Sequence, residues 1–167
     1  VLDTEHSLWN DETISLCLSI IRLTGKLAYV RLGEINKLSI SKMLDASADG
    51  LIFSTVETVE QLRRIKQCVN YPTNGGYRGL GLVRSNSWGE DNLVTKREPT
   101  IIPQIETATA VKNIEEIYSE GADFFLVGPY DLSSSLGIPG DFENELFRHE
   151  IQKIHQTIPE SKLAIHI

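Results

Sequence analysis

The sequence predicts an α/β fold built on a parallel sheet, and in particular a (β/α)8 TIM barrel. Short apolar runs alternate along the chain with segments in which apolar residues recur at helical spacing, a pattern typical of parallel strands joined by helices. Polar residues concentrate at the C-terminal ends of these runs, where barrel enzymes carry their active sites. A doubly wound open sheet is the alternative, but no glycine-rich phosphate turn follows the first strand.

The chain is expected to form a single, partial barrel domain over residues 1–167. A barrel of this class typically needs about 250 residues, and this chain has 167. It also starts with Val1 and Leu2, which look like the end of a strand already under way. We therefore expect the sequence to lack part of its barrel.

The strands and helices follow from apolar spacing. The runs expected to form strands cover residues 1–2, 27–32, 50–56, 80–83, 101–105, 124–127 and 163–167. The segments with the spacing of amphipathic helices lie between Asn10 and Gly25 and at residues 35–46, 59–69, 110–118 and 147–158. In the first helix, Asn10 or Asp11 is the expected cap, Ile14 and Leu18 belong to the inner face, and Gly25 closes the helix.

The composition is that of an ordinary globular protein and disfavours some partners. Apolar residues make up 41% of the chain and charged residues 23%. The formal net charge of -7 argues against a nucleic acid or an anionic membrane surface, because both need basic patches. No apolar run approaches the roughly 20 residues of a membrane span, and no signal peptide is visible. Cys17 and Cys68 fall on apolar faces of predicted helices, which favours reduced core cysteines in a cytoplasmic protein.

The stretch at residues 101–137 carries the strongest functional signal. Glu106 follows the apolar run 101–105, and Asp131 follows the run 124–127 after Gly-Pro-Tyr. A parallel strand–helix–strand unit brings both strand ends to the same face of a sheet, so the two carboxylates are expected to lie side by side. Two carboxylates that close repel each other unless a cation lies between them, and a divalent metal is the usual one. For either acid alone, the alternative is a helix N-cap or a solvated loop charge.

Two further polar residues follow predicted strands nearer the N-terminus. Arg31 ends the apolar strand 27–32 and needs an anionic partner. That partner is either a substrate carboxylate held in bidentate fashion or a salt bridge to Asp3 or Glu5. His6, flanked by acids, is placed to carry protons, although a lone histidine at such a position is usually structural.

Other polar segments carry weaker signals. Residues 71–81 are rich in Gly and Pro and are expected to form a functional loop, but not a P-loop, because the Lys-Ser/Thr signature is missing. Residues 84–100 are expected to form an active-site or interface loop. His149 and His155 lie on a predicted helix and are expected at the surface or in packing, whereas His166 ends the last strand and is a weak site candidate.

Several segments together resemble the HpcH/HpaI aldolase family. They are DTEH at 3–6, VR at 30–31, LDASADG at 44–50, YPTNGGYRGLG at 71–81, QIET at 104–107 and GPYDLSSSLGIPG at 128–140. These segments extend over almost the whole chain in the family's order, and QIET paired with GPxDLSxSLG is the most specific combination. The family consists of class II, metal-dependent pyruvate aldolases related to 2,4-dihydroxyhept-2-ene-1,7-dioate aldolase.

The resemblance implies a TIM barrel with a divalent cation, Mg²⁺, Mn²⁺ or Co²⁺. Glu106 and Asp131 would hold this cation together with waters and a bidentate 2-oxoacid substrate. The resemblance also implies that Arg31, Gln104 and Pro129 bind the substrate.

The resemblance further implies an activity and an assembly. His6 and Asp45 would transfer protons through a water while a 4-hydroxy-2-oxoacid is cleaved to pyruvate and an aldehyde through a metal-stabilised enolate. The family's barrel has one more strand–helix unit before Asp3 and one more helix after the last strand, so both pieces are expected to be missing here. Subunits of the family's hexamer commonly exchange that last helix, so the full-length protein is expected to be a homo-oligomer.

One departure and two alternatives remain. The family usually places a proline where this chain has Ser54, which leaves the choice of substrate open. No lysine ends a predicted strand of the sheet, and this disfavours a Schiff-base aldolase. The first alternative is a citrate-lyase-like carbon–carbon lyase acting on a CoA thioester, for which the sequence shows no CoA-binding surface. The second is a non-catalytic barrel paralogue, against which the intact carboxylate pair argues.

Overall fold

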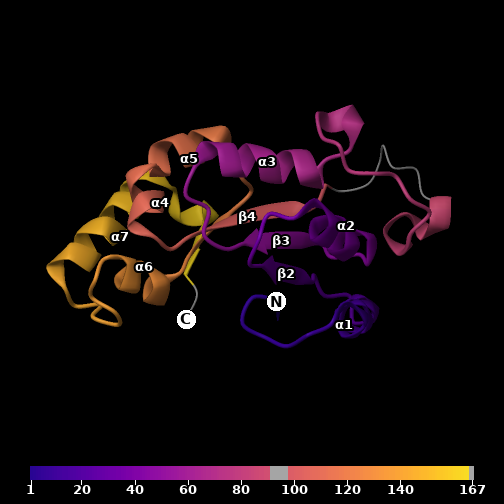
Figure 1. The fold of residues 1–167 in the computed structure, drawn as a ribbon, viewed down its shortest axis with the longest axis horizontal. Coiled ribbons are helices and arrows are strands. Elements are labelled where there is room, and N and C mark those ends of the chain that lie inside the picture. Colours follow the sequence, from indigo (N-terminus) through magenta and orange to yellow (C-terminus); the bar gives the residue numbers. More distant parts are fainter. Residues whose placement is uncertain (91–97, 166–167) are drawn as a thin grey trace. The chain divides into compact units, whose positions relative to one another are not determined.

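The computed structural model describes residues 1–90 and 98–165, and the chain divides into two compact units. The first unit consists of Val1–Ile52 and Arg64–Thr100, and the second of Phe53–Arg63 and Ile101–Ile167. Both units are built from short strands connected by helices (Figure 1).

The first unit contains three neighbouring strands in sequence order, the last of which ends at the boundary with the second unit. They are β1 (Leu2–Asp3), β2 (Tyr29–Leu32) and β3 (Gly50–Phe53). The connecting helices are α1 (Asp11–Leu23) and α2 (Lys37–Asp45), and two 3-10 helices follow at Pro72–Asn74 and Arg84–Gly89. β1 and β2 are parallel, with Asp3 opposite Arg31. α2 lies against β2 (Figure 1).

Asparagine caps fix the starts of α1 and α2. The side chain of Asn10 accepts a hydrogen bond from the backbone N–H of Thr13 at 2.8 Å. The side chain of Asn36 accepts from the backbone N–H groups of Leu38 and Ser39 at 2.9 and 3.2 Å. These N–H groups have no partner inside the helix, so each cap stabilises the helix start.

The second unit repeats the same plan. Its strands are β4 (Thr100–Ile105), β5 (Phe125–Val127) and β6 (Leu163–Ile165). Its helices are α4 (Ala108–Lys112), α5 (Ile114–Glu120), α6 (Pro129–Ser135) and α7 (Glu145–Thr157), with a 3-10 helix at Glu160–Lys162. Both strand pairs are parallel, and Ile105 lies opposite Val127. α3 (Val59–Val69) starts in this unit and ends in the first one.

The strands are largely buried, as expected for parallel strands covered by helices. All four residues of β3 are buried, and Leu51 and Phe53 are at most 1% exposed. In the second unit, Ile105 and Phe125 are fully buried, and the ring of Tyr118 on α5 lies 5.8 Å from the ring of Phe125. Burial of these side chains is the main term that stabilises each unit.

The order of the strands confirms the predicted fold class. In a (β/α)8 barrel each strand neighbours the next strand along the chain, whereas a doubly wound sheet reverses direction at a switch point. In both units the strands follow sequence order, β1-β2-β3 and β4-β5-β6. The helices between them make each crossover a β/α unit.

The prediction of a strand at residues 80–83 is wrong. The described chain has no strand there, and a 3-10 helix starts at Arg84. Leu80 and Leu82 are 64% and 75% exposed. An apolar run gains little from extended pairing when its side chains remain in water.

Two other elements differ in extent from the prediction, and the end of a third is not described. The strand expected at 50–56 ends at Phe53, because Thr55 adopts a positive φ of 53° that an extended strand cannot contain. The helix expected at 110–118 is interrupted at Asn113, which separates α4 from α5. The last two residues of the strand expected at 163–167 lie outside the described residues.

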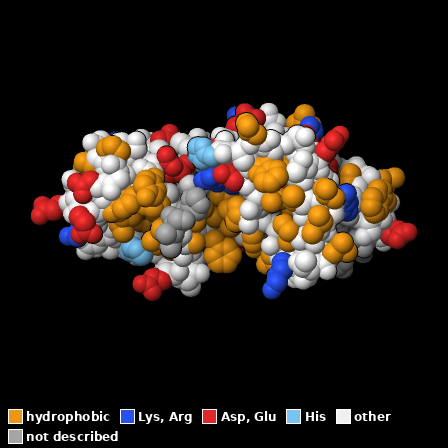
Figure 2. Space-filling view, turned by 90° about the horizontal axis from the view of Figure 1, so that it is seen from below, with side chains coloured by type: hydrophobic (Ala, Val, Ile, Leu, Met, Phe, Trp, Pro, Cys, Tyr) orange, Lys and Arg blue, Asp and Glu red, His pale blue; other side chains and the backbone are white. Residues whose placement is uncertain are grey.

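α1 has apolar side chains on two faces. Ile14 and Leu18 are buried, whereas Leu16, Ile20 and Leu23 are exposed. Figure 2 shows apolar side chains at the surface on the face that includes α1. Among the helices that the structure describes, none combines the length and the apolar character needed to cross a bilayer.

Candidate functional site

Glu106 is a buried, hydrogen-bonded carboxylate of the second unit. It follows β4 directly and is 3% exposed. Its Oε1 accepts hydrogen bonds from the backbone N–H of Thr55 at 2.7 Å and from the Thr55 hydroxyl at 2.9 Å. Its Oε2 accepts a hydrogen bond from Nε2 of Gln104. Donors on both oxygens fix the plane of the carboxylate.

The turn after β5 lies against this carboxylate. Because Ile105 pairs with Val127, the next residues, Glu106 and Gly128, are neighbours, and the N–H of Gly128 donates to the carbonyl of Ile105 at 3.1 Å. A Cβ at Gly128 would lie 2.6 Å from Oε2 of Glu106. Only glycine permits this close approach. Asp131 follows three residues later, exposed, in the first turn of α6.

The donor set fits a hard divalent cation. Glu106 and Asp131 offer carboxylate oxygens, and Oε1 of Gln104 is buried with no hydrogen-bond donor in the described part of the chain. Within residues 1–90 and 98–165, no three His, Cys, Asp or Glu side chains gather as a complete ligand set. Mg²⁺ is commonly held by one or two carboxylates, with water or substrate oxygens completing its coordination. Glu106 and Asp131 are therefore the residues that would hold such a cation.

Arg31 is held by acidic side chains of the first unit. Its guanidinium, 8% exposed, contacts Asp3 through two bonds, Nε to Oδ1 at 2.9 Å and Nη2 to Oδ2 at 2.6 Å. Its Nε also lies 3.5 Å from Oε2 of Glu5. The salt bridge from Arg31 to Asp3 or Glu5, which was one of the two alternatives in the sequence analysis, is thus present. The hydrogen bond from Arg31 lowers the pKa of the Asp3 carboxyl from 3.8 to about 2.

His6 belongs to the same cluster but is open to solvent. Its side chain is 66% exposed, and its Nε2 lies 3.7 Å from Oε2 of Glu5. Its backbone N–H and that of Glu5 both donate to Oδ1 of Asp3, at 3.5 and 3.0 Å. Asp3 therefore anchors both the loop that carries His6 and the guanidinium of Arg31.

Asp45 lies away from His6 within the first unit. It ends α2, which leads back to the start of β3, where the N–H of Asp49 donates to the carbonyl of Ala28 just before β2. His6 instead follows the C-terminal end of β1. The structure therefore does not bring His6 and Asp45 together, because they are at opposite ends of parallel strands. Asp45 pairs with the buried Arg78 instead, Oδ1 to Nη2 at 2.7 Å.

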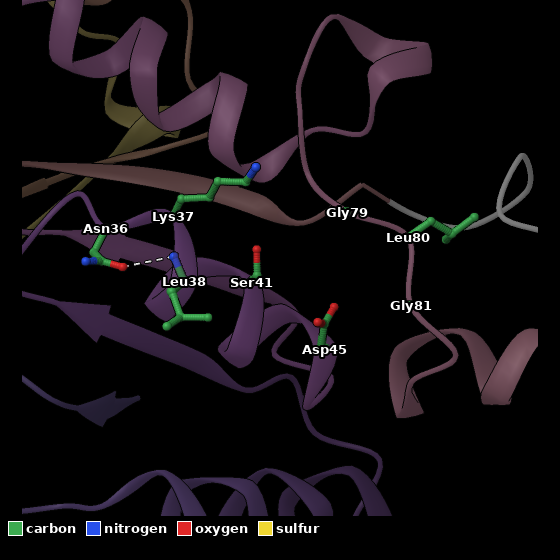
Figure 3. Close-up of a pocket in the computed structure, with 8 residues that line it drawn as sticks. All are labelled: Asn36, Lys37, Leu38, Ser41, Asp45, Gly79, Leu80 and Gly81. Carbon is green, nitrogen blue, oxygen red and sulfur yellow. Dashed lines mark hydrogen bonds between the residues drawn. The ribbon is translucent and has the colours of Figure 1, made fainter.

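A pocket of about 670 Å³ lies beside α2 in the first unit (Figure 3). Its lining residues are Asn36, Lys37, Leu38, Ser41, Asp45, Gly79, Leu80 and Gly81. Figure 3 shows Asp45 near the C-terminal end of α2, facing the segment at 79–81, with Asn36 at the other end of the helix. Among His6, Arg31, Asp45, Gln104, Glu106, Pro129 and Asp131, all of which are described, Asp45 alone lines this pocket.

The remaining candidates occupy simpler surroundings. Pro129 is the first residue of α6, where its missing N–H costs no helix bond, and Ser54 is buried directly after β3. His149 and His155 are exposed on α7, as expected, and Nδ1 of His149 lies 3.1 Å from Glu150. His166 lies outside the described residues.

The sequence interpretation missed residues that orient the candidates. Thr55 follows β3 at its C-terminal end, which is the one sequence signal that would have marked it, but its positive φ has no local signature. Gly128 was visible as part of the Gly-Pro-Tyr-Asp segment, and the pairing of parallel strand ends would have placed it beside Glu106.

Known proteins resemble this chain in sequence and in fold. The HpcH/HpaI aldolase/citrate lyase family model matches residues 1–166. The 2-keto-3-deoxy-L-rhamnonate aldolase of Salmonella gallinarum is 32% identical over 163 residues, which are 94% of this chain and 59% of that protein. The 4-hydroxy-2-oxovalerate aldolase of Novosphingobium aromaticivorans is 39% identical over 128 residues, which are 74% of this chain and 45% of that protein.

A solved structure extends the comparison to three dimensions. The crystal structure of an HpcH/HpaI aldolase/citrate lyase family protein from Burkholderia cenocepacia J2315 matches with a TM-score of 0.89 and 26% identity. The match covers 98% of this chain and 68% of that one. The chain thus spans 59% or less of the length of the two curated relatives. It belongs to the HpcH/HpaI aldolase/citrate lyase family.

Proposed function

We propose that the protein is a divalent-metal-dependent aldolase that cleaves a 4-hydroxy-2-oxoacid to pyruvate and an aldehyde. One observation carries the proposal: the buried Glu106 is oriented by Thr55 and Gln104 and lies against Gly128, in the turn that leads to Asp131. The names of the relatives, 2-keto-3-deoxy-L-rhamnonate aldolase and 4-hydroxy-2-oxovalerate aldolase, support this class of reaction.

Glu106 and Asp131 are assigned to the cation, which we propose to be Mg²⁺, Mn²⁺ or Co²⁺. When bound, the cation supplies positive charge for the oxygen on which negative charge develops during cleavage. The part played by the chain is to hold Glu106 in one orientation beforehand, which Thr55 and Gln104 do with their hydrogen bonds. Preorganised ligands do not lose conformational freedom when the cation binds.

Arg31 is assigned to the carboxylate of the 2-oxoacid. A guanidinium presents paired N–H donors that match a carboxylate, and its charge does not depend on pH in the physiological range. Asp3 and Glu5 hold the Arg31 side chain in place through the contacts described above. Gln104 and Pro129 are proposed to contact the substrate as well.

His6 is assigned to proton transfer. In the cleavage direction, the C4 hydroxyl loses its proton through a water to His6, and the C4–O bond becomes the aldehyde carbonyl. The electron pair of the C3–C4 bond passes to the pyruvyl fragment, and protonation at C3 gives pyruvate. The exposed ring of His6 is accessible to such a water. A catalytic role for Asp45 remains a prediction, since within one chain Asp45 pairs with Arg78.

Assembly and location belong to the same proposal. The exposed apolar residues of α1 support a homo-oligomer, because contiguous apolar surface is typical of a protein interface. Cys17 and Cys68 are both free, which supports a cytoplasmic protein.

The experiment is a pyruvate-release assay on the full-length protein with a small panel of 4-hydroxy-2-oxoacids. We expect pyruvate with at least one substrate in the presence of Mg²⁺ or Mn²⁺, loss of the activity with chelator, and recovery when metal is restored. His6→Ala should lower kcat by about 10²- to 10⁴-fold, the usual contribution of a general acid–base. Pyruvate release that is unaffected by chelator would contradict the proposal.

A further inference from the structure

Thr55 holds a backbone conformation that its side chain disfavours. Its φ is 53°, in the left-handed region, and the structure places it directly after the buried Ser54 at the end of β3. A β-branched residue in this region is a genuine outlier, since its branched side chain crowds the backbone there. Such residues persist where surrounding contacts determine the conformation, and they concentrate at functional sites.

The contacts that accompany this conformation converge on Glu106. With φ positive, both the backbone N–H and the hydroxyl of Thr55 donate to the same oxygen, Oε1 of Glu106, at 2.7 and 2.9 Å. The next residue, Val56, donates its N–H to the carbonyl of Gln104 at 3.3 Å. The turn at 54–56 therefore forms hydrogen bonds to two residues at the end of β4, Gln104 and Glu106, and all of these residues belong to the second unit.

The Thr55 hydroxyl bonds to Glu106 although it is accessible to water. Thr55 is exposed, so its hydroxyl has water available and is not compelled to find a protein partner. It bonds to a carboxylate that is 3% exposed, and on its other oxygen that carboxylate receives the amide of Gln104. Groups that orient a metal ligand typically change metal affinity by about 10- to 100-fold when they are removed.

We propose that Thr55 is a positioning residue for the metal site, and that its hydroxyl fixes the orientation in which Glu106 meets a divalent cation. This inference rests on the proposed function, because it takes Glu106 to be a metal ligand. Thr55 acts through Glu106 and touches neither the cation nor the substrate. Its strained conformation is kept because only that conformation delivers the N–H and the hydroxyl to one oxygen.

The decisive substitution is Thr55→Val. Valine has the same shape and the same β-branching, so the backbone strain is unchanged and only the hydroxyl donor is lost. We expect the affinity for Mn²⁺, measured by calorimetric titration of the full-length protein without substrate, to fall by about 10-fold or more. Thr55→Ser retains the hydroxyl and should bind Mn²⁺ within about 2- to 3-fold of the wild type. Thr157→Val is the matched control, because the Thr157 hydroxyl bonds only to the carbonyl of Lys153 in α7 among the described residues.

A second substitution separates metal positioning from folding. Thr55→Gly removes the hydroxyl and relieves the positive φ, so the melting temperature in chelator should stay equal or rise while Mn²⁺ binding weakens. A purely structural role would not move these two quantities in opposite directions. Wild-type Mn²⁺ affinity in Thr55→Val would overturn the inference and leave the proposed function standing. If Glu106→Gln binds Mn²⁺ as the wild type does, the metal site itself is refuted, and the inference falls with it.

Discussion

Gly128 sets how close the β5–α6 turn comes to the candidate metal ligand. We predict that Gly128→Ala displaces Glu106, because the added Cβ would lie 2.6 Å from its Oε2 and 2.8 Å from Nε2 of Gln104. Overpacking of this kind typically costs about 1–3 kcal/mol of stability, and Mn²⁺ affinity should fall with it. Chemical denaturation and calorimetric titration measure both effects. Gly79→Ala is the control, since a Cβ there meets no atom within 4 Å; an equal effect of the two substitutions would contradict the prediction.

Asp3 links the stability of the first unit to pH. Its folded-state pKa of about 2 lies below the ordinary value of 3.8, so the folded state favours the charged carboxylate. The stabilisation is therefore fully present above about pH 4 and is lost as the pH falls from 3.8 towards 2. Because the side chain is 32% exposed, solvent screening limits the effect to about 1–2 kcal/mol.

The comparison of wild type with Asp3→Asn tests this link. Denaturation between pH 2 and pH 5 should show a stability difference that is largest near pH 5 and shrinks as the pH approaches 2. A difference that is constant over this range, or that grows towards low pH, would show that the carboxylate charge is not what holds Arg31.

At the scale of secondary structure elements, one ion pair joins α2 to the loop at 71–81. Asp45 ends the helix, and Arg78, 4% exposed, also lies over the ring of Tyr71 at 4.8 Å. We predict that Asp45→Asn destabilises the protein by about 2 kcal/mol, less than the loss of a fully buried pair because Asp45 is 30% exposed. Urea denaturation gives the value.

The exposed pair between Lys42 and Asp11 is the control for this measurement. Both side chains are at least 50% exposed, so Asp11→Asn should cost less than about 1 kcal/mol. If Asp45→Asn costs no more than Asp11→Asn, the buried pair does not secure the loop. The same variant tests the catalytic prediction for Asp45, because an unchanged kcat would leave Asp45 with a structural role.

The elements show which properties the sequence determines. Burial of all four residues of β3 goes with a continuous apolar run, and β5 is likewise apolar throughout, so strand–helix alternation and the fold class were predictable. The run at 80–83 was misassigned, because apolar identity alone does not reveal that Leu80 and Leu82 stay in water. For the site, parallel pairing predicted that Glu106 and Asp131 lie side by side. The register pairs Ile105 with Val127, so the two strand ends are neighbours, and the proximity of the two carboxylates stays a prediction.

Other site features depend on information that no short segment contains. From the sequence, the anionic partner of Arg31 could be Asp3, Glu5 or a substrate carboxylate. Only the distances in the folded structure show that Asp3 and Glu5 both contact it. The role of Thr55 follows from a positive φ, which threonine rarely adopts and which therefore cannot be inferred from residue preference.

For the whole molecule, one partial reaction tests the proposed chemistry, namely formation of the pyruvate enolate. An aldolase of this kind passes through the enolate of pyruvate, whichever aldehyde it uses. Cleavage of the C3–C4 bond forms the enolate in one direction, and removal of a proton from the pyruvate methyl group forms it in the other. Glu106 and Asp131 are proposed to hold the metal, and Arg31 is proposed to hold the substrate carboxylate. Exchange of the methyl protons therefore tests enolate formation separately from carbon–carbon cleavage.

The most direct measurement is this exchange, followed by NMR in D₂O with pyruvate and the full-length protein. With Mg²⁺ or Mn²⁺, the methyl signal should decay as deuterium enters, and chelator or Glu106→Gln should reduce the rate to the uncatalysed background. Thr157→Val, altered in α7 at a hydroxyl bonded to Lys153, should exchange at the wild-type rate. Exchange that continues at the wild-type rate in chelator, or in Glu106→Gln, would contradict a metal-dependent enolate held by this glutamate.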